Sequence, residues 1–424
     1  MKILFIADNF PPERNAQASR VFERARYWAR WGHEVTVITC APNFPEGKLF
    51  TGYRNRWRQV EQTEGIRVVR VKTFIAPNAG TWLRILDFVS FMPAAFLTGL
   101  FERRPDVLVV TSPQFFAALG AAALAIFRRL PFVLELSDLW PDSIVAVGAM
   151  KPSLPLRLLE KLELWLYRRA DRIVALTNAF KRNLVRRGVP SAKVAVVING
   201  VDLETFAPRG RDHKLAAQWG IAPRHFVVGY IGTHGMAHAL TNVLDAAERT
   251  TDPDIRYILV GPGAERDNLI AETERRHLQN VIFIPAQPKN RMPEFWSLCD
   301  VALVHLRDTP LFETVIPSKI FEAMGMGLPI LLACPKGEAA AILSDSGAGL
   351  CVPPEDPQAL TDAVASLKQN PDLHRSLATH SLRSAPNHTR ERQATEYLTV
   401  LNSAASPCHS PRSPSPDQRP ATSD

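Results

Sequence analysis

The chain has 424 residues, 46% of them hydrophobic, and a formal net charge of +8. This length and composition are typical of a globular protein with two domains, and they exclude a fibrous or wholly disordered chain. The charge is uneven: residues 1–203 carry 29 Lys and Arg against 17 Asp and Glu, a net +12, whereas residues 204–424 carry 21 against 25, a net −4. We expect only the first half to meet an anionic surface. No helix-turn-helix, zinc-finger or RNP-like pattern indicates that this surface is nucleic acid.

The cysteines and the first residues indicate where the protein works. The five cysteines are odd in number and widely spaced, with no Cys-x-x-Cys pair. They argue for a reducing compartment and against a disulfide framework or a structural zinc site. The apolar run at residues 3–7 is too short for a signal peptide, so we expect a cytoplasmic protein.

The first half of the chain alternates between strand and helix patterns. Residues 3–7 are fully apolar, as expected of a parallel strand buried on both faces. A loop over residues 8–18, an amphipathic helix over 19–31 and a strand over 35–39 follow. Further apolar runs predict strands at residues 66–71, 107–111, 132–136, 173–176 and 194–198. This alternation predicts a doubly wound parallel sheet.

Two segments in this half are unusually apolar. Neither residues 81–101 nor residues 115–127 provide the roughly 20 uninterrupted apolar residues of a membrane span. We expect residues 115–127 to form a buried helix that covers the sheet. For residues 81–101 two interpretations remain open, a buried helix and a helix partly inserted in a membrane surface, because bulky residues cover most of its circumference and basic residues flank it.

A second series of strands begins near residue 225. Apolar runs predict strands at residues 226–231, 255–260, 281–284, 301–304, 330–333 and 350–352. The predicted fold class is α/β, with two tandem Rossmann-like domains facing across a cleft. We expect the domains to span residues 1–203 and 204–388, with a helix over 389–402 that packs back on the first. Residues 403–424 are rich in Pro and Ser and are predicted to be disordered.

The block at residues 317–330 is the most informative stretch. Pro317 predicts the start of a short helix that carries Lys319 and Glu322 on its first turns. A helix N-terminus attracts anions, and the charge of Lys319 strengthens that attraction. Glu322 is placed to accept hydrogen bonds from sugar hydroxyls, so the pair suits a nucleotide sugar. An ordinary capped helix is the alternative.

Six sequence blocks occur in order along the chain, at residues 6–13, 138–143, 198–202, 229–237, 260–263 and 317–330. On these blocks the chain resembles, over roughly residues 1–400, the GT-B glycosyltransferases of family 4. It is most similar to the branch that builds bacterial O-antigen, capsule and colanic-acid polysaccharides, which includes candidate L-fucosamine transferases. The resemblance implies retaining transfer of a sugar, a HexNAc or deoxy-HexNAc, from a UDP- or other NDP-sugar, with no metal or other cofactor. It further implies a glycan acceptor on a polyprenyl diphosphate carrier, reached from the inner membrane surface, which we expect residues 81–101 to contact.

The resemblance also assigns site residues. Catalytic roles fall to Asp138, Lys319 and Glu322, with Asp138 orienting or deprotonating the acceptor hydroxyl and Glu322 binding the ribose. The residues expected to bind the donor are Gly232, Thr233, His234, Gly235, Gln287, Met292, Glu313, Thr314, Pro317 and Ser318. The residues expected to meet the acceptor are Arg14, Asn15, Gln17 and Asp142.

The chain departs from the family pattern at two places. The Arg and Lys that relatives place on the donor phosphates are replaced by Thr233 and His238. The first Glu of the paired-glutamate signature is either shifted by one place, to Glu313, or lost. Two other functions therefore stay open, a nucleotide-sugar 2-epimerase of the same architecture and a non-catalytic nucleotide-sugar binder. Some of the assigned site residues also have a purely structural interpretation. Asp138 or Asp142 could be the N-cap of a helix, and residues 14–19 could form a loop that only contacts solvent.

Overall fold

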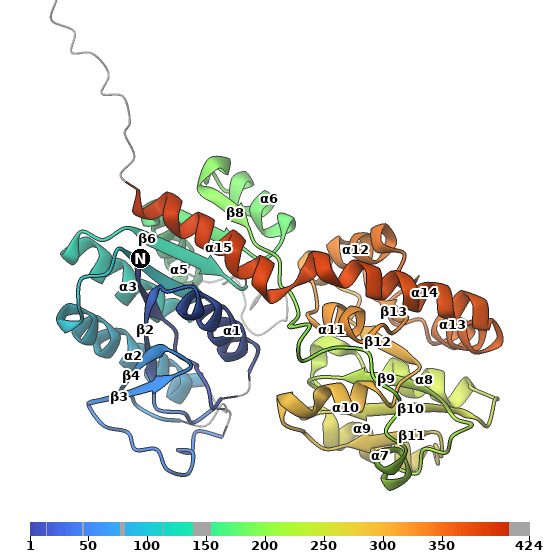
Figure 1. The fold of residues 1–424 in the computed structure, drawn as a ribbon. Coiled ribbons are helices and arrows are strands. Elements are labelled where there is room, and N and C mark those ends of the chain that lie inside the picture. The colour runs from blue at the N-terminus through green and yellow to red at the C-terminus, as the bar shows by residue number, and fades with distance from the viewer. Residues whose placement is uncertain (14, 45, 77–80, 113, 139–153, 407–424) are drawn as a thin grey trace, which may run out of the picture.

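The computed structural model describes residues 1–13, 15–44, 46–76, 81–112, 114–138 and 154–406. Two α/β domains lie side by side, and helix α15 (Arg390–Ala405) runs from the second domain back across the first (Figure 1). The predicted fold class, two Rossmann-like sheets, is confirmed.

The first sheet has eight strands in the order β3-β4-β2-β1-β5-β6-β7-β8. They are β1 (Lys2–Ile6), β2 (Glu34–Cys40), β3 (Arg58–Thr63), β4 (Ile66–Val71), β5 (Val107–Ser112), β6 (Phe132–Leu136), β7 (Arg172–Ala175) and β8 (Val194–Val196). All pairs are parallel except β3 with β4. Strand β3 was missed in the sequence because it is a polar edge strand, whose residues alternate between exposed and half-buried.

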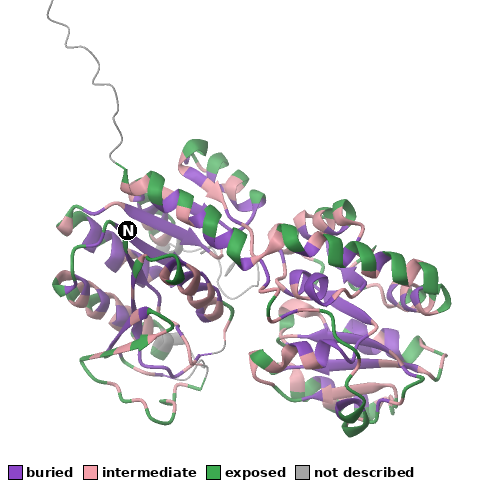
Figure 2. Ribbon diagram, viewed as in Figure 1, coloured by how far each residue is buried: buried purple, intermediate pink, exposed green. Residues whose placement is uncertain are grey.

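Helices cover both faces of this sheet, so that the buried strands form the centre of the domain (Figure 2). They are α1 (Ala16–Arg30), α2 (Thr81–Phe101), α3 (Phe115–Arg128), α5 (Leu154–Arg169), α6 (Asn178–Arg186) and the short η1 (Ser191–Lys193). Helix α1 begins three residues earlier than predicted because the Asn15 side chain caps it. Helix α3 is largely buried, as predicted, and a Cβ at Gly120 would lie 2.9 Å from the carbonyl oxygen of Met92 on α2.

The second sheet has six parallel strands in the order β11-β10-β9-β12-β13-β14. They are β9 (Phe226–Ile231), β10 (Ile255–Val260), β11 (Val281–Ile284), β12 (Val301–His305), β13 (Ile330–Ala333) and β14 (Gly349–Val352). Its α-helices are α7 (His213–Gln218), α8 (Thr241–Arg249), α9 (Arg266–Arg275), α10 (Met292–Trp296), α11 (Lys319–Met326), α12 (Glu338–Ser346), α13 (Pro357–Gln369) and α14 (Pro371–Ser384). Its 3-10 turns are η2 (Met236–His238), η3 (Lys289–Arg291), η4 (Pro310–Thr314) and η5 (Ala385–His388).

Strand order in the second sheet reverses between β9 and β12. These two strands pair only at their beginnings, through Val301 with Val228 and Ala302 with Gly229. Their carboxyl ends therefore diverge, and open α/β sheets bind ligands at such a point. The turn after β9 and the segment that leads from β12 to α11 both lie there.

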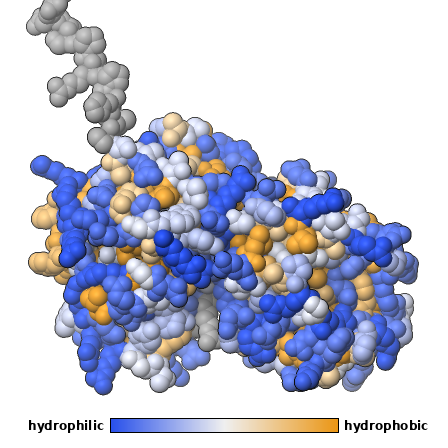
Figure 3. All heavy atoms as spheres, in the orientation of Figure 1, coloured by the Kyte–Doolittle hydropathy of each residue, from blue (hydrophilic) through white to orange (hydrophobic). Residues whose placement is uncertain are grey.

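The chain crosses between the domains twice. Val201 N donates to His388 O at 2.8 Å, and Arg390 N donates to Val201 O at 2.9 Å, so the two crossings are bonded to each other. A Cβ at Gly200 would lie 2.6 Å from the carbonyl oxygen of Thr389, so the backbones are too close for a side chain here. In the space-filling view a notch separates the lower halves of the domains (Figure 3).

Helix α15 completes the core of the first domain. The Trp28 ring lies 5.4 Å from that of Tyr397, and Trp28 Nε1 donates to Ala394 O at 2.9 Å. Residues 403–405, predicted as the start of a disordered tail, are the last turn of α15, and Ser403 Oγ accepts from Arg172 Nε at 3.2 Å. The tail beyond residue 406 lies outside the described residues.

Candidate functional site

Helix α11 begins at the carboxyl edge of the second sheet. Lys319 is its first residue, after Pro317 and the N-cap Ser318, and Gly327 ends it in a left-handed conformation at φ 69°. The short helix with Lys319 and Glu322 in its first turns is therefore confirmed.

The Lys319 side chain is only 9% exposed, and its Nζ has no hydrogen-bond partner among the described residues. Nζ lies 3.7 Å from the centroid of the Tyr230 ring and 2.9 Å from the place of a Cβ at Gly232. Because this amine has lost water without gaining a counterion, burial lowers its pKa to about 7. Lys319 thus lies against the turn after β9, where the diphosphate is expected.

The turn after β9 is held by the turn after β10. Gly232 N donates to Val260 O at 2.9 Å, and His234 N donates to Pro262 O at 2.7 Å. A Cβ at Gly261 would lie 2.1 Å from Gly232 O, so the two turns can come this close only because residue 261 is a glycine. Thr233 and Gly235, also expected to contact the donor, flank His234 in this fixed turn.

The imidazole of His234 is fully buried, with ring centroids 5.9 Å from Tyr230 and 6.0 Å from Phe283. Neither ring nitrogen has a hydrogen-bond partner among the described residues. Burial, with the positive charges of Arg266 and Lys319, lowers the His234 pKa to about 4. His234 is therefore neutral at pH 7.

Two further histidines close the gap between β9 and β12. His238 Nδ1 lies 3.2 Å from His305 O, and His305 Nδ1 lies 2.8 Å from His238 O. Since a carbonyl oxygen only accepts, each Nδ1 carries the proton, and His305 Nε2 accepts from Asn242 Nδ2 at 2.8 Å. Burial lowers the pKa of His238 to about 3 and that of His305 to about 4.

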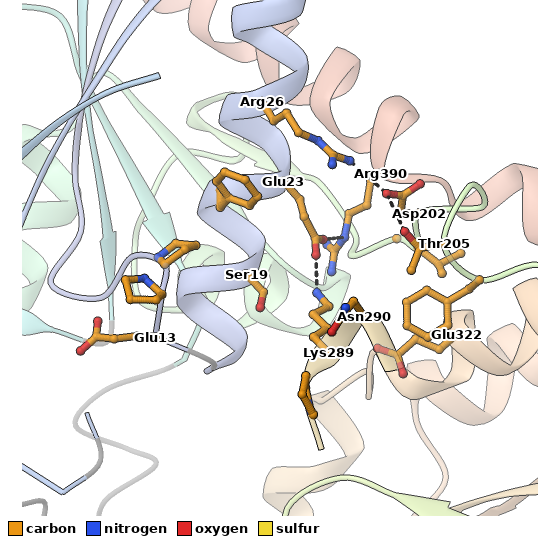
Figure 4. Close-up of a pocket in the computed structure, with 17 residues that line it drawn as sticks. Glu13, Ser19, Glu23, Arg26, Asp202, Thr205, Lys289, Asn290, Glu322 and Arg390 are labelled. Atoms are coloured by element: carbon orange, nitrogen blue, oxygen red, sulfur yellow. Dashed lines mark hydrogen bonds and ion pairs between the residues drawn. The ribbon is translucent and has the colours of Figure 1, made fainter. Parts of the chain in front are cut away.

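Glu322 lines a cavity of about 370 Å³ between the two domains (Figure 4). Its Oε2 accepts from Trp296 Nε1 at 3.3 Å, which orients the carboxylate. Burial raises the pKa of Glu322, an effect opposed by the nearby charge of Lys289. A carboxylate held this way has lone pairs left for hydroxyl groups of a ligand.

One face of α1 forms the opposite wall of this cavity. Ser19, Phe22, Glu23 and Arg26 follow the helical spacing i, i+3, i+4, i+7, and all line the cavity. Arg26 pairs with Asp202 at the first crossing, at 3.0 Å.

Glu23 connects three parts of the molecule. Its carboxylate forms ion pairs with Lys289 in the second domain and with Arg390 Nε, at 2.6 Å, where the chain crosses back (Figure 4). These two pairs hold its pKa below the usual range, against the effect of burial. This cluster was not predicted from the sequence. The signal that the sequence offers for it is the helical spacing of Ser19, Glu23 and Arg26 on α1.

The other expected donor residues are spread along the second domain. Gln287 and Met292 follow β11: Gln287 is half-buried, with Nε2 donating to Pro285 O at 3.2 Å, and Met292 begins α10 and packs against the core. Glu313 and Thr314 lie in η4 and line a different interdomain cavity, of about 840 Å³, shared with α6. The structure therefore does not bring Glu313 and Thr314 to the cavity of Glu322.

Two expected acceptor residues are engaged inside the first domain. Asn15 Oδ1 accepts from Ala18 N at 2.8 Å, and Asn15 Nδ2 donates to Asn9 Oδ1 at 2.8 Å. Gln17 Nε2 donates to Asp8 Oδ1 at 2.7 Å. Neither lines the 370 Å³ cavity. Of the others, Asp138 is half-buried just beyond β6, while Arg14 and Asp142 lie outside the described residues.

A buried ionic cluster precedes Asp138. Glu135 on β6 is fully buried and accepts from Arg20 Nε at 3.1 Å and from Arg24 Nη2 at 2.5 Å. Tyr397 OH of α15 donates to the same carboxylate at 3.3 Å, and the Arg24 guanidinium lies 4.4 Å from the Tyr397 ring centroid. The two arginines hold the Glu135 pKa low despite its burial.

One Asp-x-Asp pattern, which is common in metal-dependent transferases, occurs at residues 252–254. Asp252 binds Lys368 Nζ at 2.6 Å, and Asp254 binds Arg224 Nε at 2.9 Å. Both carboxylates precede β10, so they lie at the sheet edge opposite the cleft. They play no part in the candidate site.

Comparison with known proteins matches each domain to a family model. Residues 17–205 match the model described as Glycosyltransferase Family 4, and residues 212–382 match Glycosyl transferases group 1. A candidate colanic acid biosynthesis glycosyl transferase, WcaI of Escherichia coli (strain K12), is 26% identical over 379 residues, covering 87% of this chain and 92% of that protein.

Two further comparisons name a nucleotide. A GDP-mannose-dependent alpha-mannosyltransferase of Mycobacterium tuberculosis is 27% identical over 370 residues, 87% of this chain and 88% of that protein. The crystal structure of Anabaena Alr3699/HepE in complex with UDP-glucose has a TM-score of 0.71 and 20% identity, covering 94% of this chain and 99% of that one. This structural likeness shows the shared two-domain fold.

Proposed function

The chain belongs to glycosyltransferase family 4 and takes its sugar from a nucleotide-sugar donor, and on this premise we propose the rest of its reaction. It is a retaining transferase that moves a HexNAc or deoxy-HexNAc, of the N-acetylfucosamine type, to a hydroxyl of a glycan on a polyprenyl diphosphate carrier. The product serves surface polysaccharide synthesis, a role supported by the similarity to the colanic acid protein.

The observation that carries this proposal is the unpartnered, buried amine of Lys319 beside the Gly232 turn. A buried polar group without a partner is rare in native proteins, and a bound ion or ligand is one explanation for it. The donor diphosphate fits this place because the dipole at the start of α11 and the charge of Lys319 both favour an anion. Glu322, one turn further along α11, then binds the ribose hydroxyls in the interdomain cavity.

On the acceptor side, Asp138 at the carboxyl edge of the first sheet orients or deprotonates the attacking hydroxyl. The leaving diphosphate is stabilised by Lys319 as its charge develops. Closure of the two domains excludes water, which would otherwise compete with the acceptor.

The reaction is tested by incubating the protein with radiolabelled UDP- and GDP-sugars and a bacterial membrane lipid extract. Label that moves into the organic phase supports transfer to a lipid-linked acceptor. A soluble epimer indicates a nucleotide-sugar 2-epimerase, and label that only binds indicates a non-catalytic binder. Either of those two outcomes contradicts the proposal.

We expect Glu322→Gln to raise the KM for the donor by about 10- to 100-fold, with a smaller effect on kcat. A hydrogen bond to a charged group contributes about 1.5–3 kcal/mol, and the amide keeps the shape but loses the charge. Steady-state kinetics with varied donor measure this. Glu313→Gln, which changes a residue outside the cavity, is the matched comparison; a larger effect there would reverse our assignment of the two glutamates.

We also propose that the first turns of α2 contact a membrane surface. Leu83, Ile85 and Leu86 are exposed there, Leu86 by 53%. No helix among the described residues combines the length and hydropathy needed to cross a bilayer. The +12 charge of residues 1–203 favours anionic lipid.

Leu86→Glu is expected to lower the fraction of protein that pellets with anionic vesicles by at least about tenfold, because it removes apolar burial and adds a repelled charge. Leu382→Glu on α14, where the leucine is 44% exposed, is the control and should pellet normally. Equal pelleting of both variants would refute the membrane contact.

A further inference from the structure

Lys319 stands in a group of basic side chains with little negative charge nearby. The acidic group that favours its ammonium is Glu322, which lies on the same helix and outside ion-pair distance. The other titratable groups around it are the buried phenol of Tyr230 and the neutral rings of His234, His238 and His305, with Arg266 facing His234.

These groups cannot all carry charge at once, because no negative charge pairs with them among the described residues. Burial disfavours the charged forms of His234, His238 and His305, and repulsion by the positive charge of Lys319 lowers their pKa values further. The face of the Tyr230 ring attracts Lys319 only through its quadrupole, and Nζ has no hydrogen-bond acceptor in the part of the chain that the structure describes. Without a bound anion, the ammonium form of Lys319 is therefore disfavoured beside the turn after β9.

We propose that donor binding at mildly alkaline pH takes up one proton from solution, because the diphosphate beside the turn after β9 stabilises the ammonium of Lys319, which its buried and unpartnered position otherwise disfavours. This inference rests on the proposed donor site. The step is the addition of H⁺ to the Nζ lone pair, with the new charge compensated by the phosphate oxygens. No other bond forms or breaks.

The direction of proton transfer on donor binding, and the pH range in which it occurs, follow from the pKa of the Lys319 amine. Its pKa is about 7 in the free protein, and an opposite charge in contact raises it. Below about pH 6 the free amine is already protonated, so binding takes up almost nothing. Near pH 8 about 90% of the free amine is neutral, and uptake approaches one proton. Above pH 8 the donor Kd is therefore expected to rise about tenfold per pH unit, until the pKa of the complex is reached.

Calorimetric titration of the full chain tests this, with UDP, GDP, ADP and dTDP as probes. Each binding enthalpy is measured at pH 8 and pH 6, at each pH in two buffers that titrate there and differ in heat of ionisation. We expect the enthalpy of the nucleotide that binds to depend on the buffer at pH 8, with uptake of about one proton. At pH 6 this uptake should vanish or turn into a release, because the amine is already protonated and the terminal phosphate of the nucleotide can lose its own proton. At pH 8 the nucleotide phosphate is fully ionised and takes up nothing itself.

Lys319→Arg is the matched variant, because a guanidinium stays protonated throughout this range. It should bind the same nucleotide without proton uptake and without the pH slope. Uptake that persists in Lys319→Arg overturns the inference, because another group then titrates. If that variant does not fold, the dependence of log Kd on pH, measured for the wild-type protein between pH 8 and 9, tests the inference instead. A Kd that does not change with pH in this range overturns the inference. Binding without uptake rejects only this inference, whereas no binding of any probe rejects the donor site as well.

Discussion

Lys319→Met is expected to lower kcat/KM for sugar transfer by about 100-fold or more. Removing one positioned group that stabilises developing negative charge typically costs about 10²–10³ in rate. Methionine keeps the length of the side chain and its packing over the Tyr230 ring, so the loss reports the charge. The change in kcat/KM is measured from initial rates of label transfer, with the nucleotide sugar that proves active in the incubation with radiolabelled donors.

The control for this variant is Lys214→Met on α7, an exposed lysine outside both interdomain cavities. It should retain the wild-type rate. If Lys319→Met also transfers sugar at a near wild-type rate while its thermal unfolding is unchanged, Lys319 does not face the leaving group and the donor site lies elsewhere.

Glu135→Gln is expected to destabilise the protein by about 3–5 kcal/mol. The substitution keeps the shape of the side chain but leaves the guanidinium groups of Arg20 and Arg24 without their shared carboxylate. Breaking a buried ion pair from one side leaves an uncompensated charge, which is why the cost is large. For a domain of this size the loss corresponds to a fall in Tm of roughly 10 °C.

Differential scanning calorimetry, with circular dichroism to confirm the folded state, measures that shift. Glu64→Gln is the matched change, because Glu64 also pairs with an arginine, Arg30 at 3.6 Å, but both side chains are about half exposed. Its effect should stay within about 0.5 kcal/mol. Equal shifts for the two variants would show that the buried cluster adds no stability of its own.

Much of the fold could be predicted because parallel strands buried on both faces leave continuous apolar runs. Strands β1, β5, β9 and β12 all have this pattern, whereas the exposed edge strand β3 does not. Helix α11 was predictable because its start and its stop, Pro317 and Gly327, are both local signals.

The cluster around Glu23 could not be predicted in the same way. Glu23 and Lys289 are 266 residues apart, and each looks like an ordinary solvated charge in its own segment. Only the folded arrangement, in which α1 faces the second domain, makes them a pair. Similarly, Arg20, Arg24 and Glu135 come from two elements that meet only in the tertiary structure.

The return of α15 to the first domain has a consequence for synthesis on the ribosome. Tyr397, Ala394 and Leu401 fill the same core as Trp28 and β1, yet they are translated after the whole second domain. Domains usually fold in order as they emerge, but this first domain lacks part of its interior until the last helix leaves the exit tunnel. A nascent chain paused before residue 390 would expose the Trp28 face, which makes that interval a natural point for chaperone capture.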